Sequence, residues 1–475
     1  MKAPAFAVVG HPNKGKSSLV ATLARDPSVR VGPEPGTTTQ ARAFPMRVGG
    51  QLLYTLVDTP GFQRARSALD WMKRHETDAA SRAAIVDRFV REHLGTDRFP
   101  DECELLRPIV EGAGIIYVVD GAMPYGPEYE SEMEILRWSG QPSMAIINPI
   151  GQPRFVDPWQ RALEQFFRVV RVLDVLQAPF EQQTELLRAF GQMRETWRQP
   201  MEEAVQALVQ HREALRDDAA RVIAEMIAAA LTHRMTRDIA RDEDPRRHTP
   251  TLEAEYRGRL RQLERRARTE VEAIYGHQDV DRREADMPLL DTDLLSRESW
   301  LAFGLHKRDV VAVGAVGGAV AGGVVDAALL GASFLTGSVI GGLVGGALGF
   351  FSSDKLADVK VFRQPLGGIR LRCGPTRNLQ FPFVLLRRAL LHHAVVARRT
   401  HAQRDSLEVD REGERPALPL PDDVQRQLAR LFPRVRRSEP GSESRAAVLA
   451  ELTAVIRRLM EEGNCPDRAR GRPRG

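Results

Sequence analysis

A short stretch near the N-terminus has the residue types and spacing that bind a phosphate chain. It reads Gly10-His11-Pro12-Asn13-Lys14-Gly15-Lys16-Ser17-Ser18. Glycines let backbone N–H groups approach an anion closely, because they carry no Cβ. Lys16 can place its positive charge at the β- and γ-phosphates, and Ser17 can place its hydroxyl on Mg²⁺. This pattern predicts a nucleotide-binding loop.

The segments on either side have the order that such a loop requires. The apolar run 5–9 predicts a strand, and residues 19–23 have helical spacing. In this order the N-terminus of the helix, with its positive dipole end, lies at the phosphates. Downstream, two apolar runs within 41–57 are joined by Gly49-Gly50, which predicts a β-hairpin. The hairpin ends at Asp58-Thr59-Pro60-Gly61.

This tetrapeptide adds two more groups with a defined chemistry. Asp58 stands at the C-terminal end of a strand, where a carboxylate can reach the metal ion beside a phosphate-binding loop. Gly61 leaves a backbone N–H free for the γ-phosphate. The glycine loop, a threonine-rich segment and this tetrapeptide, in this order, form a specific combination that favours nucleotide binding over a nucleotide-free α/β domain.

These motifs resemble the G1, G2 and G3 motifs of Era/TrmE-type GTPases of the translation-factor class. The residues that carry the resemblance are Gly10–Ser17, Pro35-Gly36-Thr37-Thr38 and Asp58–Gly61. The resemblance implies that Thr38 binds Mg²⁺ and the γ-phosphate, with Thr37 and Thr39 as alternatives. It also implies that Asn13 helps to hold a K⁺ ion in place of an arginine finger.

Two positions depart from the usual GTPase pattern. Phe62 stands where other GTPases carry the water-positioning glutamine, so hydrolysis would depend on a cation, a partner or dimerisation. The base-reading motif, Asn/Thr-Lys-x-Asp in the family, is here Asn148-Pro149-Ile150-Gly151. Asn148 is in place, but Gly151 replaces the carboxylate that pairs with guanine, and such hydrogen bonds supply much of the discrimination between bases. The resemblance favours GTP, and relaxed specificity or ATP is the alternative.

The predicted site therefore has three overlapping sets of residues. The expected nucleotide-binding residues are Gly10, Asn13, Lys14, Gly15, Lys16, Ser17, Ser18, Asp58 and Asn148. The expected magnesium ligands are Ser17, Thr38 and Asp58, and the expected catalytic residues are Lys16, Thr38 and Gly61. The cofactors implied are GTP or GDP with Mg²⁺, with K⁺ as a further candidate.

Composition bounds the compartment and the partners. The chain has 475 residues, enough for two or three domains. Its cysteines, Cys103, Cys373 and Cys465, are far apart, which suggests a reducing compartment and no zinc site. No export signal precedes the first strand, so we expect a cytoplasmic protein. The net charge of +5 comes from arginine mixed with glutamate, which is more typical of solvated helix faces than of nucleic-acid binding.

Apolar periodicity predicts four regions. Residues 1–180 alternate strands and helices, which predicts an α/β P-loop NTPase with a Ras-like, mostly parallel sheet and an enlarged switch II insert at 62–111. The insert is interpreted as helices that move or dock on hydrolysis, or equally as a surface elaboration. Residues 181–305 predict helix alone, with one helix capped by Thr249 and ended by Gly276. Residues 306–402 predict an apolar hairpin and a basic helix, and 403–475 predict short helices and a disordered tail.

The stretch 310–351 is exceptional because Asp326 is its only charged residue. Its glycines recur at intervals of four, as in Gly337, Gly341, Gly345 and Gly349, which puts them on one helix face. We expect a glycine-zipper hairpin that contacts the inner face of the cell membrane. The alternative is a buried helix pair in a soluble, oligomeric domain. Further on, His392 and His393 are adjacent and diverge on a helix, so they do not form a metal pair.

The layout of residues 1–400 resembles an uncharacterised bacterial family of predicted GTPases with a C-terminal domain of unknown function. This resemblance gives no cellular role, and two functions remain as hypotheses. The first is a membrane-associated GTPase switch with slow hydrolysis that a cation or partner stimulates. The second is a nucleotide-binding scaffold or assembly protein without turnover. A homodimer through the G domain or the helical region is an open alternative, and no nucleic-acid partner is expected.

Overall fold

The computed structural model describes residues 3–24, 40–151, 153–176, 178–276, 293–295, 359–363, 368–398 and 420–462. The chain divides into two compact units, Met1–Arg212 with Arg398–Arg404, and Glu213–Ala397 with Asp405–Gly475. We call them unit 1 and unit 2. Helix α8 (Glu195–Thr232) begins in unit 1 and ends in unit 2. The predicted glycine-zipper hairpin and the threonines at 37–39 lie outside the described residues.

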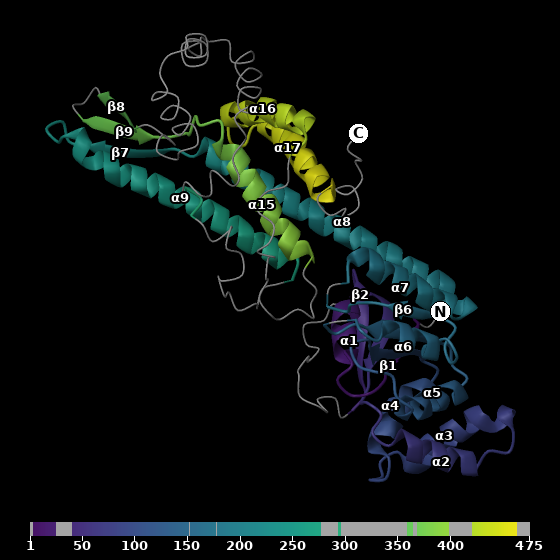
Figure 1. Cartoon of the computed structure of the whole chain (residues 1–475). Coiled ribbons are helices and arrows are strands. Elements are labelled where there is room, and N and C mark those ends of the chain that lie inside the picture. The colour runs from purple at the N-terminus through teal and green to yellow at the C-terminus, as the bar shows by residue number, and fades with distance from the viewer. Residues whose placement is uncertain are drawn as a thin grey trace, which may run out of the picture. The chain divides into compact units, whose positions relative to one another are not determined.

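Unit 1 contains a six-stranded sheet in the order β2-β3-β1-β4-β5-β6 (Figure 1). Its strands are β1 (Ala5–Val9), β2 (Arg42–Val48), β3 (Gln51–Asp58), β4 (Gly114–Asp120), β5 (Ser143–Asn148) and β6 (Val170–Val172). All neighbours are parallel except β2 and β3, the antiparallel hairpin that Gly49 and Gly50 join. This confirms the predicted mostly parallel P-loop sheet.

Helices cover both faces of this sheet. They are α1 (Lys16–Ala24), α2 (Ala65–Arg74), the 3₁₀ turn η1 (Ala79–Ser81), α3 (Arg82–His93), α4 (Pro100–Val110), α5 (Glu128–Trp138), α6 (Val156–Leu163) and α7 (Phe180–Gln192). Strand β4 shows the two faces most clearly, because successive side chains enter different cores. Ile116 and Val118 pack in a core with residues of α1, α7 and α8, whereas Tyr117 packs in a core with α2–α6.

The segment 62–111, which the sequence predicts to be a switch II insert, is a helical subdomain built onto this second core. Helices α2, α3 and α4 share an aromatic cluster that includes Trp71, Phe89 and Phe99. Phe62 and Cys103 are buried in the same core. The insert is therefore packed as part of unit 1 and is not a loose loop.

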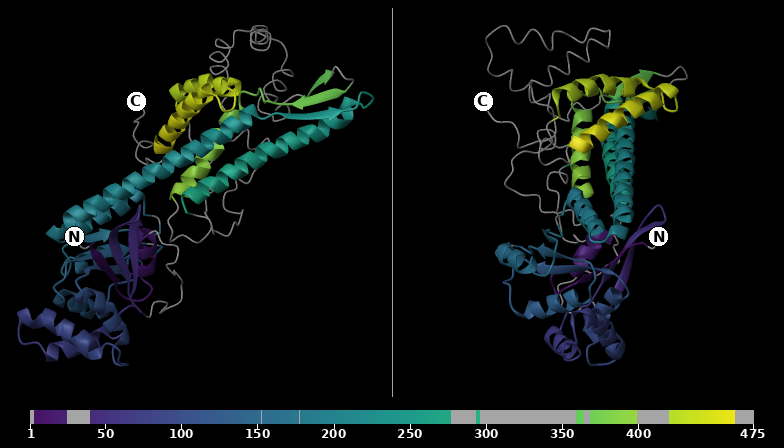
Figure 2. Two further views of the ribbon diagram at one scale, coloured as in Figure 1. Left: turned by 180° about the vertical axis from the view of Figure 1, so that it is seen from behind. Right: turned by 90° about the vertical axis from the view of Figure 1, so that its right-hand side faces the viewer.

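Unit 2 is largely helical with a small sheet. Its helices are the C-terminal part of α8, α9 (Pro245–Ile274), α15 (Phe381–Arg398), α16 (Asp422–Arg437) and α17 (Glu443–Glu462). Strands β7 (Met235–Ile239), β8 (Val359–Arg363) and β9 (Ile369–Cys373) form an antiparallel sheet in the order β7-β9-β8. Figure 2 shows α16 and α17 lying together and α15 running beside α9.

Strand β7 corrects the prediction that this region is all helix. β7 pairs with β9, which lies far along the chain, and a cross-strand ion pair joins Asp238 to Arg370 at 2.7 Å. Helix α9 also begins earlier than predicted, because Asp244 accepts a hydrogen bond from the N–H of Arg246. Thr249 lies inside the helix instead of capping it, and its hydroxyl donates to the Pro245 carbonyl.

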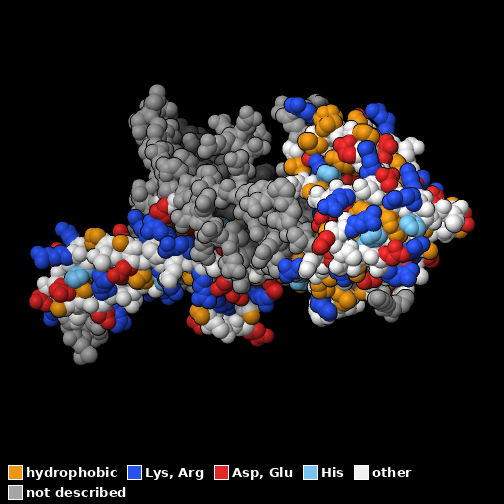
Figure 3. All heavy atoms as spheres, turned by 90° about the horizontal axis from the view of Figure 1, so that it is seen from below, with side chains coloured by type: hydrophobic (Ala, Val, Ile, Leu, Met, Phe, Trp, Pro, Cys, Tyr) orange, Lys and Arg blue, Asp and Glu red, His pale blue; other side chains and the backbone are white. Residues whose placement is uncertain are grey.

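The described surface has mixed charge. In Figure 3, Lys and Arg side chains are interspersed with Asp and Glu on the face that is seen. Among the helices in the described ranges, none is long and apolar enough to cross a bilayer.

Candidate nucleotide-binding site

The glycine loop lies between β1 and α1, and its glycines are required by close contacts. Gly10 has φ +140° and Gly15 has φ +88°. A Cβ on Gly10 would lie 2.4 Å from the carbonyl oxygen of Val118, and one on Gly15 would lie 2.3 Å from Nδ2 of Asn148. Asn13, at the tip, has φ +61° and is exposed. The loop is thus held tightly against β4 and β5 while its tip faces solvent.

Lys16, the first residue of α1, lies over this loop. Its Nζ donates to the carbonyl oxygens of Gly10, at 3.2 Å, and of His11, at 3.0 Å. Burial lowers the pKa of Lys16 to about 8, although Asp58 and Glu132 act to raise it. A buried ammonium that donates to backbone carbonyls is suited to an anion, because a phosphate would stabilise its charge. Ser18, next in α1, is half-buried.

The predicted metal ligands Ser17 and Asp58 meet in the structure. The Ser17 hydroxyl donates to Oδ2 of Asp58 at 2.8 Å, from the first turn of α1 to the end of β3. A hydroxyl and a carboxylate side by side are oxygen ligands of the kind that Mg²⁺ prefers. These residues therefore fit the ion that the sequence predicts, whereas the third expected ligand, Thr38, lies outside the described residues.

Gly61 lies against the glycine loop. A Cβ at this position would lie 2.6 Å from the backbone nitrogen of Pro12, so only glycine fits here without a shift. The Thr59 hydroxyl donates to the Val8 carbonyl at 2.8 Å and ties the segment to β1. The next residue, Phe62, is 1% exposed and belongs to the core beneath the insert. It contributes no polar group to the site.

The Asn148 side chain links the glycine loop to the segment that follows β6. Its Nδ2 donates to the Lys14 carbonyl at 3.3 Å, and its Oδ1 accepts from the Val175 N–H at 3.2 Å. Gly151 has φ +83° with open space around the position of a Cβ, and Ile150 is exposed. Asn148 thus has a positioning role, while the loop 148–151 presents no carboxylate to a base.

Two further contacts at the loop were not predicted from the sequence. Lys14 is buried, and its Nζ lies 3.8 Å from Oδ2 of Asp120 at the end of β4. The second contact joins Nδ1 of His11 to Oε1 of Glu132 at 2.9 Å, and the Tyr117 hydroxyl donates to Oε2 of the same carboxylate at 2.8 Å. The position of Asp120 at the end of a buried strand beside the loop could have predicted its contact with Lys14. The sequence gives no such signal for Glu132, because the segment around it has the pattern of a surface helix.

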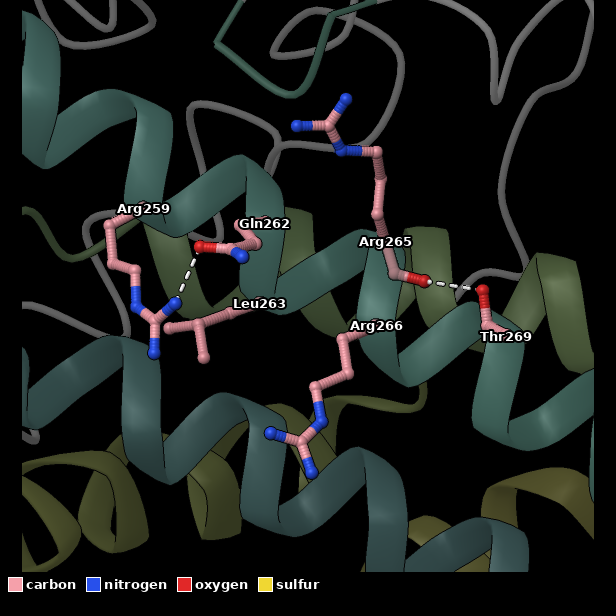
Figure 4. A pocket seen from close by; sticks show the side chains of 6 residues that line it. All are labelled: Arg259, Gln262, Leu263, Arg265, Arg266 and Thr269. Carbon is pink, nitrogen blue, oxygen red and sulfur yellow. Dashed lines mark hydrogen bonds between the residues drawn. The ribbon is translucent and has the colours of Figure 1, made fainter.

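A hollow of about 320 Å³ lies on α9 in unit 2 (Figure 4). It is lined by Arg259, Gln262, Leu263, Arg265, Arg266 and Thr269. Arg259 donates to Gln262 and Arg266 to Glu270, so two of its polar groups are bonded along the same helix. We assign no site to it, because these lining residues come from one element and do not converge on a common point.

The fold and the loop geometry define a P-loop GTPase domain of the Era and Der class. Residues 5–148 match the model of the 50S ribosome-binding GTPase family. Residues 160–457 match a family described as a domain of unknown function (DUF3482). That match covers more than half of the chain, so the chain belongs to this family. The predicted resemblance is confirmed for both parts.

The chain spans about a quarter or less of the length of the GTPase Der relatives that it matches. GTPase Der of Paraburkholderia phymatum is 28% identical over 145 residues, which are 30% of this chain and 26% of that protein. GTPase Der of Azoarcus sp. is 49% identical over 61 residues, 13% of this chain and 14% of that protein. A crystal structure of Aquifex aeolicus Era bound to GDP·AlF₄⁻ covers 58% of this chain and 90% of its own, at 16% identity and a TM-score of 0.28.

Proposed function

We propose that unit 1 binds GTP and GDP with Mg²⁺ and hydrolyses GTP slowly, so that the protein acts as a molecular switch. The observation that carries this proposal is the convergence of Lys16 with the Ser17–Asp58 pair on one glycine loop. The match of residues 5–148 to the model of a GTPase family and the likeness to GTPase Der support it.

Each group at the loop has a role in this function. Lys16 exchanges the carbonyls of Gly10 and His11 for phosphate oxygens. Ser17, Asp58 and, by the resemblance, Thr38 would hold a Mg²⁺ ion, which would supply positive charge against the charge that develops on the phosphates. The N–H of Gly61 serves the γ-phosphate. Phe62 is buried, so it does not orient the attacking water. We therefore expect turnover to depend on K⁺ near Asn13, on a partner or on dimerisation.

Competition calorimetry tests the choice of nucleotide. The full chain is titrated with MgGTP, MgATP and MgXTP, alongside Gly151→Asp and Lys16→Met. We expect tight binding of GTP by the unaltered chain and stronger preference for GTP over ATP in Gly151→Asp, because the restored carboxylate pairs with the guanine edge. Equal binding by Lys16→Met and the unaltered chain would contradict the assignment of the loop.

Phosphate release in K⁺ against Na⁺ tests the reaction. We expect measurable GTP turnover in K⁺ and less in Na⁺. The buried Phe62 and the absent carboxylate at Gly151 favour a second candidate, a nucleotide-binding scaffold without turnover. Absence of phosphate release in both salts, with GTP and with ATP, would contradict the GTPase function and favour the scaffold.

The proposal places the switch at the inner face of the cell membrane through residues 310–351. Its support is the sequence of that stretch, where glycine spacing and the near absence of charge favour helices in lipid. Extraction from a membrane fraction tests it. We expect the chain to need detergent, and release by high salt alone would contradict membrane insertion.

A further inference from the structure

Glu102, on α4 of the switch II insert, holds the backbone that follows Gly61. It is 1% exposed, and its Oε1 accepts hydrogen bonds from the N–H of Gln63 at 2.9 Å and of Arg64 at 2.5 Å. These donors stand at the N-terminus of α2, where a carboxylate is stabilised by charge-assisted bonds and by the helix dipole. The segment that senses the γ-phosphate is therefore fixed by the insert.

Glu104, two residues further on, holds the backbone directly before β2. Its Oε2 accepts from the Ala41 N–H at 3.0 Å, where the chain enters β2 just after the threonines at 37–39. Arg107 also donates to this oxygen, at 2.9 Å. One helix thus contacts the flanks of both switch segments. We call Glu102 and Glu104 the α4 clamp.

A basic pocket of about 740 Å³ lies beside the clamp. It is lined by Arg64, Ser67, Asp70, Lys73, Arg74, Arg98 and Phe99. Four of these residues are cationic and one is acidic, and all but Phe99 are exposed. The pocket and the clamp share Arg64, because Glu102 holds its N–H while its guanidinium lines the pocket and donates to the Arg98 carbonyl at 3.0 Å.

We propose that this basic pocket docks an acidic segment of a partner protein, and that the α4 clamp transmits docking to the nucleotide site. Carboxylates in the pocket would compete with the Arg98 carbonyl for the Arg64 guanidinium and so pull on the residue that Glu102 holds. A peptide fits better than RNA, because the lining aromatic, Phe99, is 3% exposed and offers no face for base stacking. The second half of the proposal rests on the proposed nucleotide switch.

A labelled hexaglutamate peptide tests the docking by fluorescence anisotropy on the full chain. The variant is Lys73→Glu/Arg74→Glu, and the matched control is Arg88→Glu/Arg91→Glu on α3, where the same charge is reversed on exposed residues outside the pocket. We expect the pocket variant to weaken binding about tenfold and the control to weaken it less than about twofold. Equal loss in both variants, or no binding by the unaltered chain, would overturn the docking site.

A uridine 12-mer is the competing probe. Tighter binding of this RNA than of hexaglutamate, lost in the pocket variant only, would assign the pocket to nucleic acid and overturn the proposal. Both measurements are direct and need no bound nucleotide. The docking result therefore stands or falls separately from the proposed GTPase function.

Transmission is measured as the rate of GDP release with and without saturating hexaglutamate. We expect the peptide to change the rate at least about threefold in the unaltered chain and to leave it unchanged in Glu102→Gln, which still binds the peptide. Glu104→Gln, which weakens the bonds to Ala41 and Arg107 and leaves Glu102 in place, gives a second readout if Glu102→Gln does not fold. Peptide binding without any change in GDP release would overturn the role of the clamp.

Discussion

Both units bury charged side chains, but they satisfy them in opposite ways. In unit 1 the Lys16 ammonium donates to loop carbonyls, and Nζ of Lys14 lies 3.8 Å from Oδ2 of Asp120. In unit 2 Arg388 is 1% exposed, and its Nε donates to Oε1 of Glu264 at 2.7 Å. Arg268 donates to the same oxygen at 2.7 Å. The first arrangement leaves the Lys16 ammonium on neutral carbonyl oxygens, whereas the second places two guanidinium groups on one buried carboxylate.

The unit 2 network continues along α9 and α15. His392 lies 3.1 Å from Oε1 of Glu272, and Nε2 of His393 lies 2.8 Å from the Tyr275 hydroxyl. Both histidines are buried, and each has a polar partner at the C-terminal end of α9 or directly after it. Such a network needs no ligand, and we interpret it as fixing how α9 packs on α15. Buried charge alone therefore does not mark a binding site. The partners of each buried charge also have to be identified.

The largest expected effect is that of Lys16→Met on nucleotide binding. Loss of the ammonium should weaken MgGDP binding by about 4 kcal/mol, on the order of a thousandfold, since a buried charge–phosphate contact is removed. Unfolding by denaturant should show unit 1 unchanged or slightly more stable, because an incompletely paired buried charge is lost. Calorimetry and denaturation together check this, and a large loss of stability with little loss of binding would put Lys16 in the same category as Arg388.

Arg388→Ala should show the opposite pattern. Removing one partner leaves Glu264 buried beside Arg268 alone and opens a cavity, which should cost unit 2 about 3 kcal/mol of unfolding free energy. Nucleotide affinity should not change. The double variant Arg388→Met/Glu264→Gln should recover part of the loss, and its failure to do so would show that the pair is not coupled.

Asn148→Ala is expected to affect both properties, because its side chain positions loops without contacting phosphate. Loss of its bonds to Lys14 and Val175 should destabilise unit 1 by about 2 kcal/mol and weaken binding of all nucleotides equally. Competition calorimetry separates this outcome from a base-reading role. A selective loss of GTP over ATP would contradict the positioning role.

The sequence predicted unit 1 well because its signals are local. The strand at 5–9 was predicted at its observed limits, and the hairpin predicted within 41–57 forms around Gly49 and Gly50, because apolar runs and turn residues mark both. The pairing of Ser17 with Asp58 follows from one rule, that parallel strands end at the same edge of a sheet. In contrast, Glu102 and Glu132 acquire their roles only through packing, and nothing in their neighbours distinguishes them from solvated glutamates.

Unit 2 was less predictable, because its structure depends on contacts between distant parts of the chain. Strand β7 lies between two long helices and gains its structure from β9, which the local pattern cannot reveal. The basic residues of α15 were interpreted as one face of an amphipathic helix, yet Arg388 and His393 are among its most buried side chains. Their partners are Glu264 on α9 and Tyr275 directly after it, and a single sequence does not show which helix supplies them.

The smallest expected effect is on the pH dependence of binding. Burial lowers the pKa of Lys16 from 10.5 to about 8 in the ligand-free chain, so folding is disfavoured by its charge below that pH and this cost fades as pH rises from 8 towards 10.5. A bound phosphate favours the charged form, so binding above pH 8 must take up a proton. MgGDP affinity should then fall on the order of eightfold, or about 1 kcal/mol, between about pH 7.5 and 9.

Calorimetry in buffers of different ionisation enthalpy measures the proton uptake directly. Lys16→Arg is the control, because its guanidinium stays protonated and its affinity should remain flat over this range. A flat profile for the unaltered chain would mean that the ammonium is not the group that meets the phosphate, and the contrast with the closed network of unit 2 would then fail.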